Sequence, residues 1–217
     1  MRPHIINKET HGIAGWYIDK SVCIDLIKYF ENSPNKGLGL LYLECGGRGV
    51  DKKRKLSTDI PISLDNRYKA IVNYYKELTK VTKAYKKKYK YCDHQQSPWA
   101  ITGDWNLQKY KPKEGYFAKH CERNGPITIY RHLVFMTYLN TIKEGGETEF
   151  YYQEISIKPK KGSLVIFPTT WTHLHRGRMP ISNDKYICNL WLLRRNPIID
   201  EMADNLMFKD HFMNKNN

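Results

Sequence analysis

Residues 158–194 decide the fold, and they run KPKKGSLVIFPTTWTHLHRGRMPISNDKYICNLWLLR. Segments rich in β-branched and aromatic residues, at 163–168, 173–176 and 184–194, alternate there with turns that contain Gly, Pro, Asn and Asp. The same pattern extends back to Pro98 and predicts further strands at 100–111, 115–122, 129–139 and 148–157. Seven short strands at this spacing are typical of a β-sandwich or a jelly roll, so we predict a mainly β fold.

The first 97 residues have a different pattern. Apolar residues at helical spacing predict a helix at about 21–31 and a longer one at about 66–89. Residues 44–66 are rich in Gly and charge, and we expect them to be irregular apart from a short alternating piece at 60–64. We therefore expect one domain over 1–217: helical and irregular support over 1–97, the β core over 98–195, and a tail over 196–217 with a short helix after Asp200.

The composition narrows the classes of function. Thirty-six Lys and Arg against 22 Asp and Glu give a net charge of +14, which suits nucleic acid, an acidic peptide or a solubilising surface. Aromatic residues make up 13% of the chain, which argues against disorder for its bulk. The five cysteines form no CxxC, which argues against a disulfide framework and a structural zinc site.

Location and source are also reflected in the composition. The chain has no apolar run near the ~18 residues that cross a bilayer and no signal-like start, so we expect a cytoplasmic protein without a membrane partner. The abundance of Lys, Asn and Ile suggests an AT-rich genome, viral or bacterial. The sequence does not specify an oligomeric state.

The segment His120-Cys121-Glu122 is the first candidate site. Residues i and i+2 of a strand point to the same face, so an imidazole and a carboxylate are presented together. They are two of the three groups of a 2-His-1-carboxylate facial triad, although a surface strand would carry the same residues. A second histidine would come from His173 or His175, whereas His132 has no polar neighbours before its apolar strand.

Lys185 is the second candidate, because it is a cation at the start of an otherwise apolar strand. If it points inward, burial requires an anionic partner, which a dicarboxylic cosubstrate would provide through a charge-assisted hydrogen bond. The local pattern alone favours a solvent-facing lysine.

As a set, the motifs of this region resemble the Fe(II)- and 2-oxoglutarate-dependent dioxygenases, specifically their prolyl 4-hydroxylase-like branch. The resemblance is dense over 98–195 and loose over 1–97. The stretches that carry it, in the family's order, are LQKYKPKEGY at 107–116, HCE at 120–122, YLN at 138–140, EGGETEF at 144–150, KPKKGSLVIFP at 158–168, HRGRMP at 175–180 and KY at 185–186.

The resemblance implies a double-stranded β-helix, the jelly-roll or cupin-like core, with helices on its outside. It assigns the iron ligands to His120, Glu122 and His175, where Glu122 replaces the Asp that most members have. It also assigns the cosubstrate carboxylate to Lys185. Four further residues match positions around the cosubstrate, and each could equally be an ordinary core or turn residue; they are Tyr110, Tyr138, Thr148 and Trp191.

The resemblance further implies Fe(II), 2-oxoglutarate and O₂ as cofactor and cosubstrates, with ascorbate as an auxiliary reductant and succinate and CO₂ as products. A protein or peptide prolyl substrate is the first expectation. Related branches of the superfamily act on other protein side chains, free amino acids or nucleobases, so these stay open as substrates. Basic segments at 51–55 and 83–90 keep nucleic acid or an acidic peptide open as a partner. A hypothesis of another class is a non-catalytic basic binding module on a degenerate jelly roll.

Overall fold

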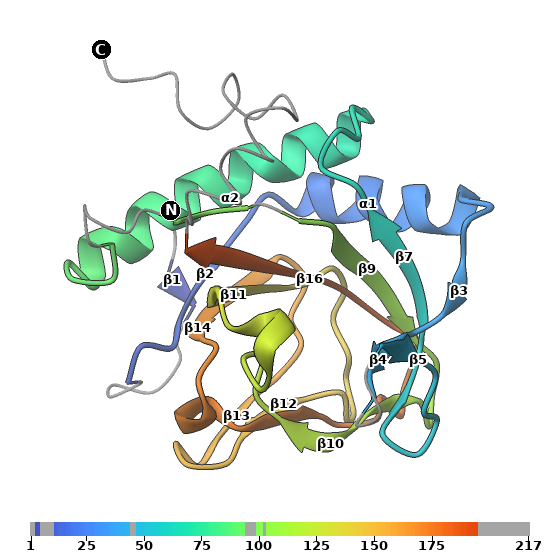
Figure 1. Cartoon of the computed structure of the whole chain (residues 1–217). Helices are drawn as coiled ribbons and strands as arrows, with labels where there is room; N and C mark the ends of the chain where they lie inside the picture. The colour runs from blue at the N-terminus through green and yellow to red at the C-terminus, as the bar shows by residue number, and fades with distance from the viewer. Residues whose placement is uncertain (1–2, 5–10, 44–46, 94–98, 102, 195–217) are drawn as a thin grey trace.

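The computed structural model describes residues 3–4, 11–43, 47–93, 99–101 and 103–194. Two β-sheets face each other in this part of the chain, and two helices cover the outer side of the larger sheet (Figure 1). This arrangement confirms the predicted mainly β class with a jelly-roll core and flanking helices. The predicted helix after Asp200 lies outside the described residues.

The larger sheet has nine strands among the described residues, eight of them in the order β1-β2-β14-β11-β16-β9-β7-β3, with β8 paired to β16. The strands, in that order and then β8, are Pro3–His4, Ala14–Tyr17, Ser163–Pro168, Arg131–Tyr138, Lys185–Arg194, Trp105–Tyr110, Thr58–Ile62, Gly37–Leu38 and Trp99–Ala100. The smaller sheet has the order β13-β12-β15-β10-β6, and its strands are Ile155–Ile157, Thr148–Phe150, His175–Gly177, Gly115–His120 and Lys55–Leu56. A short hairpin joins β4 (Leu41–Tyr42) to β5 (Arg48–Gly49), and 3₁₀ turns occupy Pro126–Thr128 and Trp171–His173.

Strand alternation divides the core into two clusters. On β11, Leu133 and Phe135 face the helices, whereas Val134 and Met136 face the smaller sheet. Both faces of this strand are buried, which explains its continuous apolar sequence. The inner cluster forms the wall of the space between the sheets, where the candidate residues lie.

The two helices begin and end close to the predicted positions. Helix α1 spans Lys20–Asn32, and its N-cap Asp19 accepts a hydrogen bond from the backbone N–H of Ser21 at 2.8 Å. Helix α2 spans Lys69–Lys88 and buries its apolar face against the larger sheet, while its last turn carries three lysines. No helix in the described part of the chain is long and apolar enough to cross a membrane.

Three sequence predictions differ from the structure. The predicted strand at 148–157 is two strands, β12 and β13, with a turn between them in which Glu154 has a φ of 53°. Of the strand predicted at 100–111, Trp105–Tyr110 forms β9, and Ala100 belongs to the separate strand β8. The sheets also take strands from residues before 98, among them β2, β6 and β7, although we expected that part to be helical and irregular. These strands are two to five residues long and form by pairing with longer neighbours, so they leave little periodicity in the sequence.

Candidate active site

Three predicted metal ligands meet in the structure. His120 ends β10 and His175 begins β15, and the two residues are directly opposite each other in the antiparallel pair. Glu122 follows β10, and its Oε1 lies 3.6 Å from Nε2 of each histidine. One ligand atom from each of the three residues lies within 4.8 Å of the others, a separation that one metal ion could span.

The hydrogen bonds of the two imidazoles fit a metal site. Nδ1 of His120 lies 3.0 Å from the Ala118 carbonyl oxygen, and Nδ1 of His175 lies 2.9 Å from the His173 carbonyl oxygen. A carbonyl only accepts, so each Nδ1 carries the proton and donates it. Both Nε2 lone pairs therefore face the cluster, which is the tautomer that a metal requires.

The charge of Glu122 also suits a metal ligand. The side chain is buried, and burial by itself raises a carboxyl pKa. The adjacent His120 and His175 and the charge of Arg131 outweigh this effect and hold the pKa of Glu122 well below its usual range. Burial and the nearby His175 lower the pKa of His120, which favours the neutral, metal-binding form.

His173 occupies a different place from His175. It lies in the 3₁₀ turn Trp171–His173, and its Nε2 contacts the backbone carbonyl oxygen of His11 at 2.7 Å. We expected both histidines to share one face of a strand, but the turn places His173 toward the N-terminal segment. Among the described residues, His175 is the histidine that joins His120 and Glu122.

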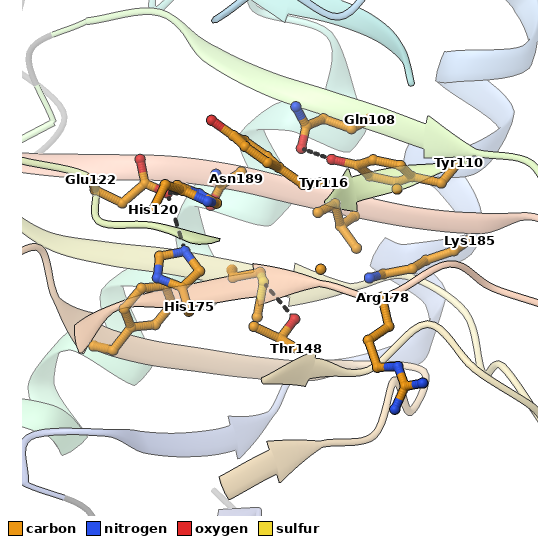
Figure 2. Close-up of a pocket in the computed structure, with 15 residues that line it drawn as sticks. Gln108, Tyr110, Tyr116, His120, Glu122, Thr148, His175, Arg178, Lys185 and Asn189 are labelled. Carbon is orange, nitrogen blue, oxygen red and sulfur yellow. Dashed lines mark hydrogen bonds and ion pairs between the residues drawn. The ribbon is translucent and has the colours of Figure 1, made fainter. Parts of the chain in front are cut away.

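Lys185 lies at the other end of the same cavity (Figure 2). Its side chain is 3% exposed, and it forms no hydrogen bond or ion pair with any described residue. Burial lowers the pKa of Lys185 to about 8, although the charge of Glu147 opposes the shift. Lys185 therefore points inward, as the family resemblance implied, and not toward solvent, as the local pattern favoured; Ile187 of the same strand face belongs to the cluster between the sheets.

The other predicted cosubstrate residues lie at two separate places. Tyr110 and Thr148 line the cavity with Lys185, and the lysine Nζ is 5.5 Å from the Tyr110 ring centroid. Tyr138 is buried beside them: its ring centroid is 5.6 Å from the lysine Nζ, and its hydroxyl donates a hydrogen bond to the Thr148 hydroxyl at 2.7 Å. Trp191 lines a neighbouring groove instead, where its indole N–H donates to Oε2 of Glu122 at 2.9 Å.

Two residues of this site were not predicted. Tyr116 stacks on the His120 ring with 3.7 Å between centroids and an angle of 11° between planes. Arg131 donates to Oε2 of Glu122 at 3.2 Å. Both had a signal in the sequence: Tyr116 shares the strand face of His120 by alternation, and Arg131, like Lys185, is a cation at the start of an apolar strand.

A groove of about 340 Å³ opens next to the metal ligands. The hairpin β4–β5 contributes Leu41, Tyr42 and Arg48 to its wall, and Trp191 comes from β16. Of the predicted basic segment at 51–55, Arg54 and Lys55 line this groove, whereas Lys52 and Lys53 are exposed. The segment at 83–90 ends helix α2 on the far side of the larger sheet (Figure 1), so it lies apart from the candidate site.

Comparison with known proteins agrees with this geometry. Residues 105–193 match the family model of the 2OG-Fe(II) oxygenase superfamily. Prolyl 4-hydroxylase 13 of Arabidopsis thaliana is 25% identical in an alignment of 107 residues that covers 39% of this chain and 38% of that relative. The matched region therefore spans less than half of the curated relative.

Solved structures share the fold. A prolyl hydroxylase from Trichoplax adhaerens, in complex with a hypoxia inducible factor peptide fragment, has a TM-score of 0.65 at 16% identity, covering 91% of this chain and 88% of that one. A viral collagen prolyl hydroxylase from Paramecium bursaria Chlorella virus-1, solved as its 2OG complex, has a TM-score of 0.59 at 20% identity, covering 85% and 96%.

The fold and the His-Glu-His cluster agree with the resemblance to the 2-oxoglutarate/Fe(II) dioxygenases found in the sequence. Residues 105–193, which include the three candidate ligands, match the 2OG-Fe(II) oxygenase superfamily, and the solved prolyl hydroxylases share the fold of the chain. Both findings support the resemblance found in the sequence. The matched family implies Fe(II), 2-oxoglutarate and O₂.

Proposed function

We propose that this protein hydroxylates a prolyl residue of a protein or peptide, using Fe(II), 2-oxoglutarate and O₂ and releasing succinate and CO₂. The observation that carries the proposal is a single cavity with three metal ligands at one end and a buried, unpartnered Lys185 at the other. A metal alone would leave the lysine without a role, whereas a dicarboxylate bound to the metal can reach it with its second carboxylate.

Each residue of the cavity then has a task. His120, Glu122 and His175 would hold the metal, and Lys185 would bind the far carboxylate of 2-oxoglutarate by a charge-assisted hydrogen bond. Stacking by Tyr116 fixes the plane of the His120 ring. When bound, the metal and 2-oxoglutarate supply the oxidation, in which one atom of O₂ enters the substrate C–H bond and the other enters succinate.

The groove beside Glu122 is the proposed place of the substrate. It contacts the metal ligands and is lined by aromatic side chains, among them Tyr42, Tyr116 and Trp191. Extended proline-rich segments dock in aromatic-lined grooves because their conformation is already fixed before binding. This supports a peptide substrate over a free amino acid, which would not fill the groove.

Succinate release tests the function. Purified protein with Fe(II), ascorbate and 2-oxoglutarate is screened against proline-rich peptides, free proline and oligonucleotides, and we expect peptide-stimulated succinate together with a peptide mass increase of one oxygen. His175→Ala should reduce release to background, by roughly 10²-fold or more, because a facial triad without one imidazole no longer fixes the metal. Unchanged turnover in His175→Ala would refute the triad. Succinate release that is stimulated by oligonucleotides alone would refute the peptide substrate and identify a nucleic acid as the substrate.

The non-catalytic alternative has its own test. A functional site should develop a weak visible charge-transfer absorption when Fe(II) and 2-oxoglutarate are added without O₂, whereas a degenerate binding module should stay colourless. If the module binds nucleic acid instead, its affinity should fall steeply with salt, since phosphate contacts release counterions.

A further inference from the structure

The two carboxylate oxygens of Glu122 have different surroundings. Oε1 lies 3.6 Å from Nε2 of both His120 and His175. Oε2 points the other way and accepts two hydrogen bonds, from the Trp191 indole N–H at 2.9 Å and from Arg131 Nη1 at 3.2 Å. One carboxylate oxygen of Glu122 thus faces the other candidate metal ligands, and the second is bound by protein donors.

The two donors hold each other in place. The Arg131 guanidinium carbon is 3.9 Å from the centroid of the Trp191 ring, a cation–π arrangement. Arg131 begins β11 and Trp191 lies on β16, and these strands pair side by side in the larger sheet. Nη1 of Arg131 also donates to the backbone carbonyl of Glu122 at 3.1 Å, so it fixes both the main chain and the side chain of this ligand.

We propose that Arg131 and Trp191 are positioning residues that occupy Oε2 of Glu122 and leave Oε1 alone for the metal. The inference rests on the proposed function, because it takes Glu122 as a metal ligand. A carboxylate that binds through both oxygens takes two coordination positions, whereas a facial triad needs one position from each ligand to leave three open. Glutamate has one more rotatable bond than aspartate, so a buried glutamate ligand depends more on donors that fix its orientation.

Binding of Mn(II) alone, followed by electron paramagnetic resonance of the free ion, tests the proposal without turnover. Trp191→Phe keeps a ring against Arg131 but removes the N–H donor, and we expect Mn(II) affinity to fall by about 10- to 100-fold. Arg131→Gln should weaken binding in the same direction. Tyr186→Phe is the matched control: it lies on the same strand and removes a donor to the carboxylate of Glu31, so Mn(II) affinity should stay as in the wild type.

A double-mutant cycle separates positioning from packing. In Glu122→Asp the side chain is one methylene shorter, so it cannot reach both the metal side and the indole. Trp191→Phe should therefore cost little further Mn(II) affinity in the Glu122→Asp background, although it costs about 10-fold or more in the wild type. Equal losses in both backgrounds would overturn the proposal, since Trp191 would then act by packing alone. Thermal unfolding of every variant identifies any that fails to fold, and Arg131→Gln then replaces Trp191→Phe in the cycle.

Failure of this inference can be told apart from failure of the proposed function. If His175→Ala binds Mn(II) as tightly as the wild type, the triad itself is wrong. If His175→Ala loses binding while Trp191→Phe and Arg131→Gln keep wild-type affinity, the triad stands and the positioning role is refuted.

Discussion

Two lysines in the described part of the chain, Lys55 and Lys185, are buried to the same extent, each 3% exposed. Lys55 forms an ion pair with Asp59 at 2.7 Å, and Asp59 also accepts hydrogen bonds from Ser57 and Gln108. Lys185 has no such partner among the described residues. Burial of an ammonium is costly in both places. The protein itself provides the counter-charge for Lys55, whereas the counter-charge for Lys185 would come from a ligand.

The largest effect on stability should follow from breaking the ion pair between Lys55 and Asp59. Asp59→Ala removes the partner of Lys55 and leaves a buried charge, so we expect the free energy of unfolding to fall by about 3–5 kcal/mol, measured by urea denaturation. The double variant Lys55→Met with Asp59→Leu is the control, and it should lose much less because no unpaired charge remains. A loss under about 1 kcal/mol in Asp59→Ala would mean that water solvates Lys55 in the folded state.

Replacing Lys185, which has no ion-pair partner among the described residues, should increase the free energy of unfolding and not decrease it. The pKa of Lys185 falls from its ordinary 10.5 to about 8, and that difference corresponds to roughly 3 kcal/mol of destabilisation at neutral pH. Lys185→Met should therefore raise the unfolding free energy of the ligand-free protein, by up to that amount. The same variant should weaken 2-oxoglutarate binding by about 10- to 100-fold, measured by calorimetry with Mn(II) present. A destabilised Lys185→Met would contradict the comparison.

The stability and the ligand affinity of the protein should both depend on pH through Lys185. Between about pH 8 and 10.5 the unfolded chain keeps the Lys185 proton while the folded chain loses it, so this group makes stability rise with pH there. Binding of a dicarboxylate needs the charged form, so its affinity should fall in the same window, by roughly fivefold from pH 8 to pH 9. Lys185→Arg is the control, since its charge persists through this range and should leave the affinity flat.

The smallest effect is expected at the exposed lysines of helix α2. Lys83 and Lys87 are solvated, so replacing both with Gln should change the unfolding free energy by less than about 0.5 kcal/mol and leave succinate release unchanged. Urea denaturation and the turnover assay check this. Loss of turnover on an oligonucleotide substrate in this variant would assign the basic segment to substrate binding.

Much of the architecture could be predicted because it depends on local patterns. The abundance of β-branched and aromatic residues predicted strands β11 and β16, and helical spacing of apolar residues predicted helix α1. Strand β7 was predicted only as a short alternating piece, since it is five residues long and contains Pro61. It forms because it pairs with β9, a contact between residues far apart in the sequence.

The site divides in the same way. Alternation placed His120 and Glu122 together, and the motif order assigned His175, which the structure brings to them. His173 could not be separated from His175 by residue type, because only the 3₁₀ turn and the contact with His11 direct it elsewhere. Arg131 and Trp191 meet Glu122 only through pairing between β11 and β16.

The sequence by itself determined the strand-rich core, the candidate ligands and the presence of a cation at the start of a buried strand, because residue type and periodicity are local properties. The tertiary structure decided which charges have partners. Lys55 and Lys185 are the same residue with the same burial, but their surroundings differ. Asp59 lies four residues after Lys55 and contacts it because the chain passes there from the smaller sheet to the larger one, whereas no described carboxylate forms an ion pair with Lys185. Residue type and spacing do not show whether a lysine is buried or which carboxylates the fold brings within reach of it, so the pairing of these two charges is decided by the tertiary structure.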